Sequence, residues 1–287
     1  MTQPVIAGVD GSDRGLEAAR FAADEASRRG APLRLVTVVP WPYDGLSAPP
    51  PDLDLPALLH RSGESVVGAA ADTVADVDVS TSVLDGDPVS VLTELSGDAQ
   101  LVVLGGRGVG GVAGLVLGST ASGVVAHAHC PVVVLPDDSA VVVHGRQSVV
   151  VGVEGRPRDE DVLAFAVAEA ARRGTDLVAV HAWQDVVLDL PLREVSPLID
   201  WAGVRADEER VLAEALAGWR EKEPDLVVRE AVVRDRPARA LTAASLTAQL
   251  LVVGHRRRRS PGSTTHGVLH RAGCPVAVVP LPPGDRS

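Results

Sequence analysis

The fold can be predicted from the stretch LVVLGGRGVGGVAGLVLGST, residues 101–120. Its first four residues are apolar and include two adjacent valines, a pattern typical of a buried strand. Residues 105–118 hold seven glycines in fourteen positions, which predicts a loop, and Ser119-Thr120 then open a helical pattern. The stretch therefore predicts a β-strand, a glycine-rich loop and an α-helix in succession.

The same alternation of strand and helix continues on both sides of this stretch. Apolar, β-branched runs at 5–9, 33–39 and 79–84 precede it, and another follows at 132–135. Helical patterns separate the runs and cover 14–29, 56–74, 88–95 and 119–127. Strands that alternate with helices are joined by right-handed crossovers, which give a parallel sheet with helices on both faces. The predicted fold class is α/β.

The chain contains this organisation twice. At a spacing of 144 residues, Gly8-Val9-Asp10-Gly11 matches Gly152-Val153-Glu154-Gly155, and Cys130-Pro131-Val132 matches Cys274-Pro275-Val276. In between, the spacing slips to 149, where Pro88 matches Pro237. A repeat of this length indicates two copies of one domain. We expect these domains at residues 1–136 and 147–281, with an exposed linker between them.

Composition limits the classes of protein that fit. The 287 residues are 46% apolar and 23% charged, which is typical of a globular chain. A net charge of -11 repels phosphate backbones and anionic lipids, so we expect neither a nucleic acid nor a membrane as partner. The sequence shows no secretory signal and no apolar run near the ~20 residues of a membrane helix. Two cysteines give no disulfide framework, and we expect a cytoplasmic location.

The glycine-rich loop predicts a phosphate site. Glycines let backbone N–H groups approach a ligand, and the helix that starts at Ser119 favours an anion at its N-terminus. A flexible loop followed by an ordinary helix cap is the alternative. A Walker A loop is excluded because the one lysine, Lys222, lies far from this loop. Gly106-x-Gly108-x-x-Gly111 spells the dinucleotide fingerprint, but it follows the fourth strand rather than the first.

Other segments can face the same crevice as this loop. Asp10 follows the first strand and residues 37–39 end the second. Gly-Val-Asp-Gly-Ser at residues 8–12, Gly105-x2-Gly108-x9-Gly118-Ser119 and a closing Cys-Pro-Val strand together resemble the universal stress protein family, as two tandem copies. The resemblance implies two doubly wound, five-stranded parallel sheets of the flavodoxin-like or adenine nucleotide alpha hydrolase-like fold.

The resemblance also implies a ligand, because the long glycine spacing is that of the ATP-binding branch of this family. ATP is the expected cofactor, with Mg²⁺ as an optional companion. Asp10 and the backbone at Val38 are expected to hold the adenosine, and the glycine loop is expected to hold the ribose and phosphates. The candidate residues of the first copy are Asp10, Gly11, Val38, Gly105, Arg107, Gly108, Gly118, Ser119 and Thr120.

The second copy departs from the pattern of the first. Glu154 replaces the aspartate, and Arg257 stands where the second glycine should be. The loop is five residues shorter, and arginines at 256–259 fill it. The second copy could contain a normal nucleotide site or an altered or empty one, and both alternatives remain. We expect the two copies to bind nucleotide unequally. The candidate residues of the second copy are Glu154, Gly254, Gly262, Ser263 and Thr264.

Two further patterns have simple structural explanations. His266, His270 and Cys274 have a spacing that can bind zinc, and His127-x-His129-Cys130 lies at the matching place. However, each cysteine precedes a proline and no further ligand lies nearby, so we expect no metal site. Asp85-Gly86-Asp87-Pro88 is typical of a turn that leads into a helix.

The resemblance implies an ATP-binding stress-response sensor or regulator rather than an enzyme of high turnover. The sequence places no general base or arginine finger near the phosphates, so any ATP hydrolysis should be slow. An ATP-hydrolysing or adenylyl-transferring enzyme that uses the same crevice is one alternative, and a nucleotide-free assembly module is another. We also expect an unknown protein partner.

The last strand of each copy predicts assembly. Strands at 132–135 and 276–279 are apolar edge strands with no strand after them in their copy, and such edges are normally covered. In the family that the chain resembles, these edges meet each other. We therefore expect pseudo-twofold pairing of the two domains, and a homodimer is also compatible with these edges.

Overall fold

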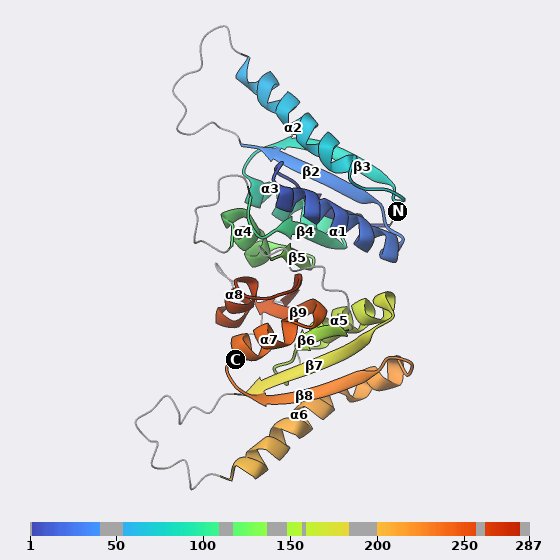
Figure 1. Ribbon diagram of the computed structural model, residues 1–287, viewed down its shortest axis with the longest axis vertical. Coiled ribbons are helices and arrows are strands. Elements are labelled where there is room, and N and C mark those ends of the chain that lie inside the picture. Colours follow the sequence, from blue (N-terminus) through green and yellow to red (C-terminus); the bar gives the residue numbers. More distant parts are fainter. Residues whose placement is uncertain are drawn as a thin grey trace, which may run out of the picture. The chain divides into compact units, whose positions relative to one another are not determined.

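The computed structural model describes residues 2–40, 54–108, 117–136, 148–156, 159–183, 200–256 and 262–281 (Figure 1). These residues form two compact units. Unit 1 contains the described residues up to 136, and unit 2 contains those from 148 onward. Each unit consists of a β-sheet covered by α-helices.

Unit 1 alternates strands with helices. Its elements are β1 (Val5–Gly8), α1 (Asp13–Arg29), β2 (Leu33–Val39), α2 (Leu55–Ala71), β3 (Val79–Asp85), α3 (Pro88–Leu95), β4 (Leu101–Gly105), α4 (Ser119–His127) and β5 (Val132–Leu135). The strands are parallel and follow the order β3-β2-β1-β4-β5. Helices α1 and α2 pack together on one face, and α3 and α4 pack together on the other. The doubly wound α/β fold is confirmed.

Unit 2 has the same architecture. Its elements are β6 (Ser148–Gly152), α5 (Asp159–Arg173), β7 (Asp176–Trp183), α6 (Trp201–Lys222), β8 (Val228–Arg234), α7 (Pro237–Ser245), β9 (Ala248–Arg256), α8 (Ser263–Leu269) and β10 (Val276–Leu281). Its parallel strands follow the order β10-β9-β6-β7-β8. Helix α5 packs with α6, and α7 packs with α8.

Most predicted boundaries in unit 1 lie within one residue of those observed. The largest difference is at α2, which ends at Ala71 rather than at residue 74. The backbone continues as a tightened turn in which the N–H groups of Thr73 and Val74 donate to carbonyls three residues back. The predicted turn before α3 is confirmed, because the Asp87 carboxylate accepts hydrogen bonds from the Ser90 N–H and hydroxyl at 2.8 Å each.

The core is built from small and branched apolar side chains. Leu101, Val102 and Val103 of β4 have no exposed surface, and Ala18 and Ala22 of α1 have none either. Strands buried on both faces read as continuous apolar runs, which is why the strand pattern was clear in the sequence. Small side chains on α1 let this helix lie close to the sheet.

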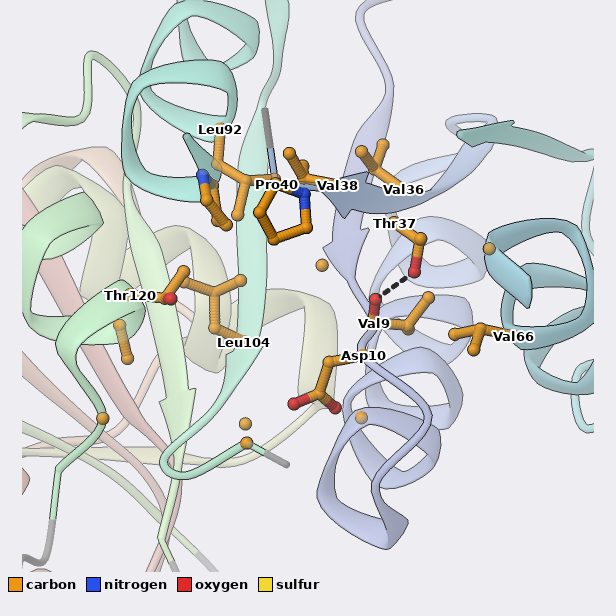
Figure 2. A pocket seen from close by; sticks show the side chains of 18 of the residues that line it. Val9, Asp10, Val36, Thr37, Val38, Pro40, Val66, Leu92, Leu104 and Thr120 are labelled. Atoms are coloured by element: carbon orange, nitrogen blue, oxygen red, sulfur yellow. Dashed lines mark hydrogen bonds between the residues drawn. The ribbon is translucent and has the colours of Figure 1, made fainter. Parts of the chain in front are cut away.

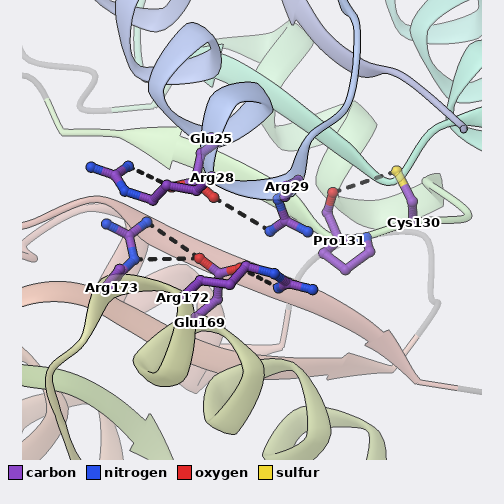
Figure 3. A network of polar contacts seen from close by, with 8 residues as sticks. All are labelled: Glu25, Arg28, Arg29, Cys130, Pro131, Glu169, Arg172 and Arg173. Carbon is purple, nitrogen blue, oxygen red and sulfur yellow. Dashed lines mark hydrogen bonds and ion pairs between the residues drawn. The ribbon is translucent and has the colours of Figure 1, made fainter.

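Each unit buries one glutamate in the middle of an arginine pair (Figure 3). Glu25 of α1 is 1% exposed, and its two carboxylate oxygens accept from Arg28 at 3.3 Å and from Arg29 at 3.4 Å. Helix α5 repeats the arrangement with Glu169, Arg172 and Arg173. A buried carboxylate needs such partners, because an isolated charge away from water is costly. The repeated Glu-x-x-Arg-Arg pattern therefore has a structural role.

We predict that Glu169→Ala destabilises the protein. Removing one member of a buried ion pair typically costs about 3–5 kcal/mol, and Arg172 and Arg173 would both lose this acceptor. Urea unfolding would measure the change in the free energy of unfolding. Glu214→Ala is the matched control, since Glu214 is exposed on α6 and its removal changes the net charge equally. Equal stability of the two variants would contradict a structural role for the pair.

A second prediction concerns the thiol of Cys130. Burial raises the pKa of this thiol to about 12. The thiolate is the reactive form, so the folded protein should resist alkylation at about pH 8, where an unfolded cysteine reacts readily. Intact mass before and after denaturation would measure labelling by iodoacetamide. Labelling of Cys130 in the folded chain at the denatured rate would show that the thiol is accessible and ionised.

Candidate functional site

A cavity opens in unit 1 at the point where the winding of the sheet reverses (Figure 2). Strands β1 and β4 are neighbours, with Val5 opposite Leu101 and Gly8 opposite Leu104. The chain leaves β1 toward β2 on one side and leaves β4 toward β5 on the other. Ligand sites of open parallel sheets lie at such a point, outside the carboxyl ends of the strands. The cavity measures about 520 Å³, within the range of about 300–1,000 Å³ that small-molecule sites occupy.

One part of the cavity wall is apolar. Its side chains come from β2, β4 and helices α2 and α3, and they include Val36, Val38, Val66, Leu92 and Leu104, with Pro40 just after β2. The hydroxyl of Thr37, which lies in this region, donates a hydrogen bond to the carbonyl of Val9 (Figure 2). This buried polar group is therefore satisfied within unit 1. A wall of this kind suits a flat, largely apolar group.

Two glycines let helices approach the cavity. A Cβ on Gly63 of α2 would lie 2.7 Å from Cγ1 of Val83 and 3.2 Å from Cγ2 of Thr37. A Cβ on Gly15 of α1 would lie 2.9 Å from Oδ1 of Asp10. A glycine inside a helix costs about 1 kcal/mol relative to alanine, so these positions need another reason to be glycine. Both line the cavity, and the close approach is that reason.

A carboxylate lies between the two strand ends. Oδ1 of Asp10 accepts hydrogen bonds from the N–H of Ser12 at 3.1 Å and from its hydroxyl at 2.6 Å. Its other oxygen, Oδ2, faces the glycine loop, where a Cβ on Gly108 would lie only 2.2 Å away. No side chain fits at position 108 while Asp10 keeps this place. Asp10 and Gly108 are therefore matched to each other.

The two ends of the glycine loop are hydrogen-bonded to each other. The N–H of Gly118 donates to the carbonyl of Gly106 at 2.7 Å, which brings the two ends of the loop together. Gly118 is the N-cap of α4, and Ser119 and Thr120 form its first residues. The first N–H groups of a helix have no partner within the helix, and they favour an anion. Residues 109–116 of this loop lie outside the described residues.

The structure brings most first-copy candidates together. The cavity is lined by Asp10, Val38, Gly105, Arg107, Gly108, Gly118, Ser119 and Thr120. Gly11 is not among the lining residues. Its φ of +83° lies in the left-handed region, which glycine adopts most easily, so its observed role is to form the turn between β1 and α1.

Sequence reasoning missed the helix residues of the site. Gly15, Gly63, Val66 and Leu92 all line the cavity, and none belongs to a strand end or to the glycine loop. One clue was present, because a glycine in the middle of the apolar helical stretch 56–74 has no local explanation. Whether a helix residue faces a cavity depends on how the helix packs against the sheet, and a single sequence does not show this packing.

The second-copy candidates repeat this arrangement only at the start of the last helix. Glu154 is exposed and lies 3.5 Å from the guanidinium of Arg256 and 3.7 Å from that of Arg156. Gly254 lies in the core layer, where a Cβ would meet Val162 at 2.9 Å. Gly262 caps α8, which begins with Ser263 and Thr264. Of the arginine run, Arg256 ends β9, and residues 257–259 lie outside the described residues.

The described part of the chain contains neither a cluster of metal ligands nor a helix suited to a membrane. Within it, no three His, Cys, Asp or Glu side chains gather in a group that could hold a metal ion. The rings of His266 and His270 lie 4.1 Å apart, and Cys274 is buried. None of the helices in the described ranges combines the length and the apolar character that crossing a bilayer requires.

Comparison with known proteins gives a consistent result. The profile described as "Universal stress protein family" matches residues 1–136 and 145–280. The universal stress proteins Rv2623 and Rv2005c of Mycobacterium tuberculosis are 40% and 39% identical to the chain, over 96% of it and over 95% and 96% of their own lengths. A crystal structure of a universal stress protein from Archaeoglobus fulgidus matches with a TM-score of 0.71 at 20% identity, covering 99% of this chain and 97% of that one. The chain therefore belongs to the universal stress protein family, as a tandem of two family domains.

Proposed function

We propose that unit 1 binds ATP and that the protein acts as a nucleotide-dependent sensor or regulator in a stress response. The observation that carries the proposal is the cavity beside the ends of β1 and β4. One part of this cavity is an apolar wall, and another is formed by Gly106 and Gly118, which are hydrogen-bonded to each other just before α4. Membership of the universal stress protein family supports the regulatory part of the proposal.

The apolar wall is suited to the adenine base. Val38, Leu92 and Leu104 offer side-chain surface, and Val38 lies close to the carboxyl end of the parallel strand β2. Asp10 lies at the edge of this wall with its carboxylate toward Gly108. A carboxylate accepts hydrogen bonds from hydroxyl groups, so this position suits the ribose side of adenosine.

The phosphates would be held mainly by backbone N–H groups. Among the described residues that line the cavity, Arg107 is the one basic side chain. The first turn of α4 supplies N–H donors and the positive end of a helix dipole. Glycines at 105, 108 and 118 keep side chains away from this path. Since no group of acidic or imidazole ligands occurs in the described part, Mg²⁺ would enter with the phosphates.

We predict that Gly108→Ala weakens ATP binding at least about tenfold. The new Cβ would collide with Asp10, and a displaced charge-assisted hydrogen bond is worth about 1.5–3 kcal/mol, against 1.4 kcal/mol for a tenfold change. Isothermal titration calorimetry would measure the dissociation constant. Gly68→Ala is the matched control, because nothing lies within 4 Å of a Cβ at that position of α2. Unchanged affinity in Gly108→Ala would remove the glycine loop from the site.

We predict that Asp10→Ala weakens the binding of adenosine and the binding of ATP by a similar factor. The contact that it removes is made to the nucleoside, which both ligands share. Asp24→Ala, on the exposed side of α1, makes the same change of charge away from the cavity and should leave both affinities unchanged. Calorimetry with each ligand would measure the two factors. A variant that loses ATP but binds adenosine normally would place Asp10 beside the phosphates instead.

A further inference from the structure

Unit 2 contains a buried polar pair near the carboxyl end of its second strand, β7. His181 of β7 is 6% exposed, and its Nδ1 lies 2.9 Å from the carbonyl oxygen of Val153. Its Nε2 lies 2.8 Å from Oε2 of Glu208, which is on α6. The carbonyl can only accept, so Nδ1 donates to it. The imidazole thus ties the end of the first strand of unit 2 to a helix that covers the sheet.

Strand register places His181 where unit 1 has Thr37. The first two strands of each unit pair in the same register, so position 181 corresponds to position 37 at the spacing of 144. Both side chains also bond to the same backbone group, which is the carbonyl of Val9 in unit 1 and of Val153 in unit 2. His181 therefore replaces a much smaller residue at a position that lines the unit 1 cavity.

Helix register places Glu208 where unit 1 has Gly63. The turn glycine after β1 faces Val66 of α2, and the turn glycine after β6 faces Val211 of α6. Gly63 and Glu208 each lie three residues before these valines, which is about one helical turn away on the same face. In unit 1 this position is bare backbone beside Thr37. In unit 2 it carries a carboxylate that reaches His181.

A third lining position follows the same trend. Asp159 of α5 corresponds to Gly15, which lines the unit 1 cavity. Its Oδ2 accepts hydrogen bonds from three consecutive N–H groups, those of Glu154, Gly155 and Arg156, at 2.9, 2.7 and 3.0 Å. Burial raises the pKa of Asp159, and the three N–H donors act against that rise. A carboxylate of the chain itself thus occupies three backbone donors that follow β6.

We infer that His181 and Glu208 exclude a nucleoside from the unit 2 crevice, and that Thr37 and Gly63 admit one in unit 1. The inference rests on the proposed binding of ATP in unit 1. According to this inference, the size of the side chains at these two positions determines which unit binds the nucleoside. The glycine loop is not the only determinant. A shortened loop would alter contacts to phosphates, whereas this pair excludes the base and ribose.

Photolabelling with azidoadenosine tests the inference in the full chain. The probe lacks phosphates, so a difference between the two glycine loops in their phosphate contacts does not affect the result. In the wild-type protein, we expect label in peptides of unit 1 at least about tenfold above that in unit 2. In the double variant His181→Thr with Glu208→Gly, we expect label in unit 2 to rise by about the same factor while label in unit 1 stays constant.

Each outcome of this experiment has one meaning. Equal labelling of both units in the wild-type chain would overturn the inference and leave the proposed function intact. A folded double variant with no label in unit 2 would also overturn it, because opening these two positions should admit the probe. Label in neither unit of the wild-type chain would contradict the proposed function, and the inference would fail with it.

The reciprocal change tests the same inference without relying on the folding of an altered unit 2. Thr37→His with Gly63→Glu transfers the polar pair to unit 1, where we expect at least about a tenfold loss of label. Gly68→Glu is the control, because it adds the same charge to the same helix at a position with open space around it. Full labelling of unit 1 in the double variant would show that these positions do not control access.

Discussion

The pairing of β1 with β4 positions every part of the unit 1 cavity. Their shared register sets Gly8 beside Leu104, so both strands end at the same level and their continuations diverge. That level fixes where Asp10 meets the glycine loop and where α1 must pass close by. A slip of one residue would turn the side chains of a strand to the opposite face of the sheet and separate these groups. The site is therefore a property of strand register before it is a property of side chains.

The two units kept the residues that maintain the fold and changed several of those that line the unit 1 cavity. The buried glutamate with its two arginines recurs in α1 and α5 with the same spacing. Positions 15, 37 and 63, in contrast, carry small residues in unit 1 and Asp159, His181 and Glu208 in unit 2. A packed fold tolerates this because the lining residues contribute surface to a cavity rather than contacts to the core. One backbone architecture can thus present an open crevice or one closed by its own side chains.

Elements defined by local pattern were predictable, and contacts across the fold were not. The strand at 132–135 and the helix at 88–95 were placed correctly, because continuous valines and an Asp-Pro start are local features. Gly63 was missed, since its role depends on how close α2 lies to β3. The His181–Glu208 pair was missed for a related reason. The spacing between the copies shifts from 144 in the first two strands to 145 in this helix, and only packing shows which residues then correspond.

Ligand binding to one of the two compact units has a thermodynamic consequence. A ligand that binds the folded form of one unit stabilises that unit by RT ln(1 + [L]/Kd), about 2.7 kcal/mol at a hundredfold excess over Kd. If only unit 1 takes nucleotide, ATP stabilises unit 1 directly and contributes no binding free energy at unit 2. A fall in ATP would then narrow the gap between the halves and increase opening in unit 1 alone. Proteolytic susceptibility, rather than any change of shape, would then report the energy state of the cell.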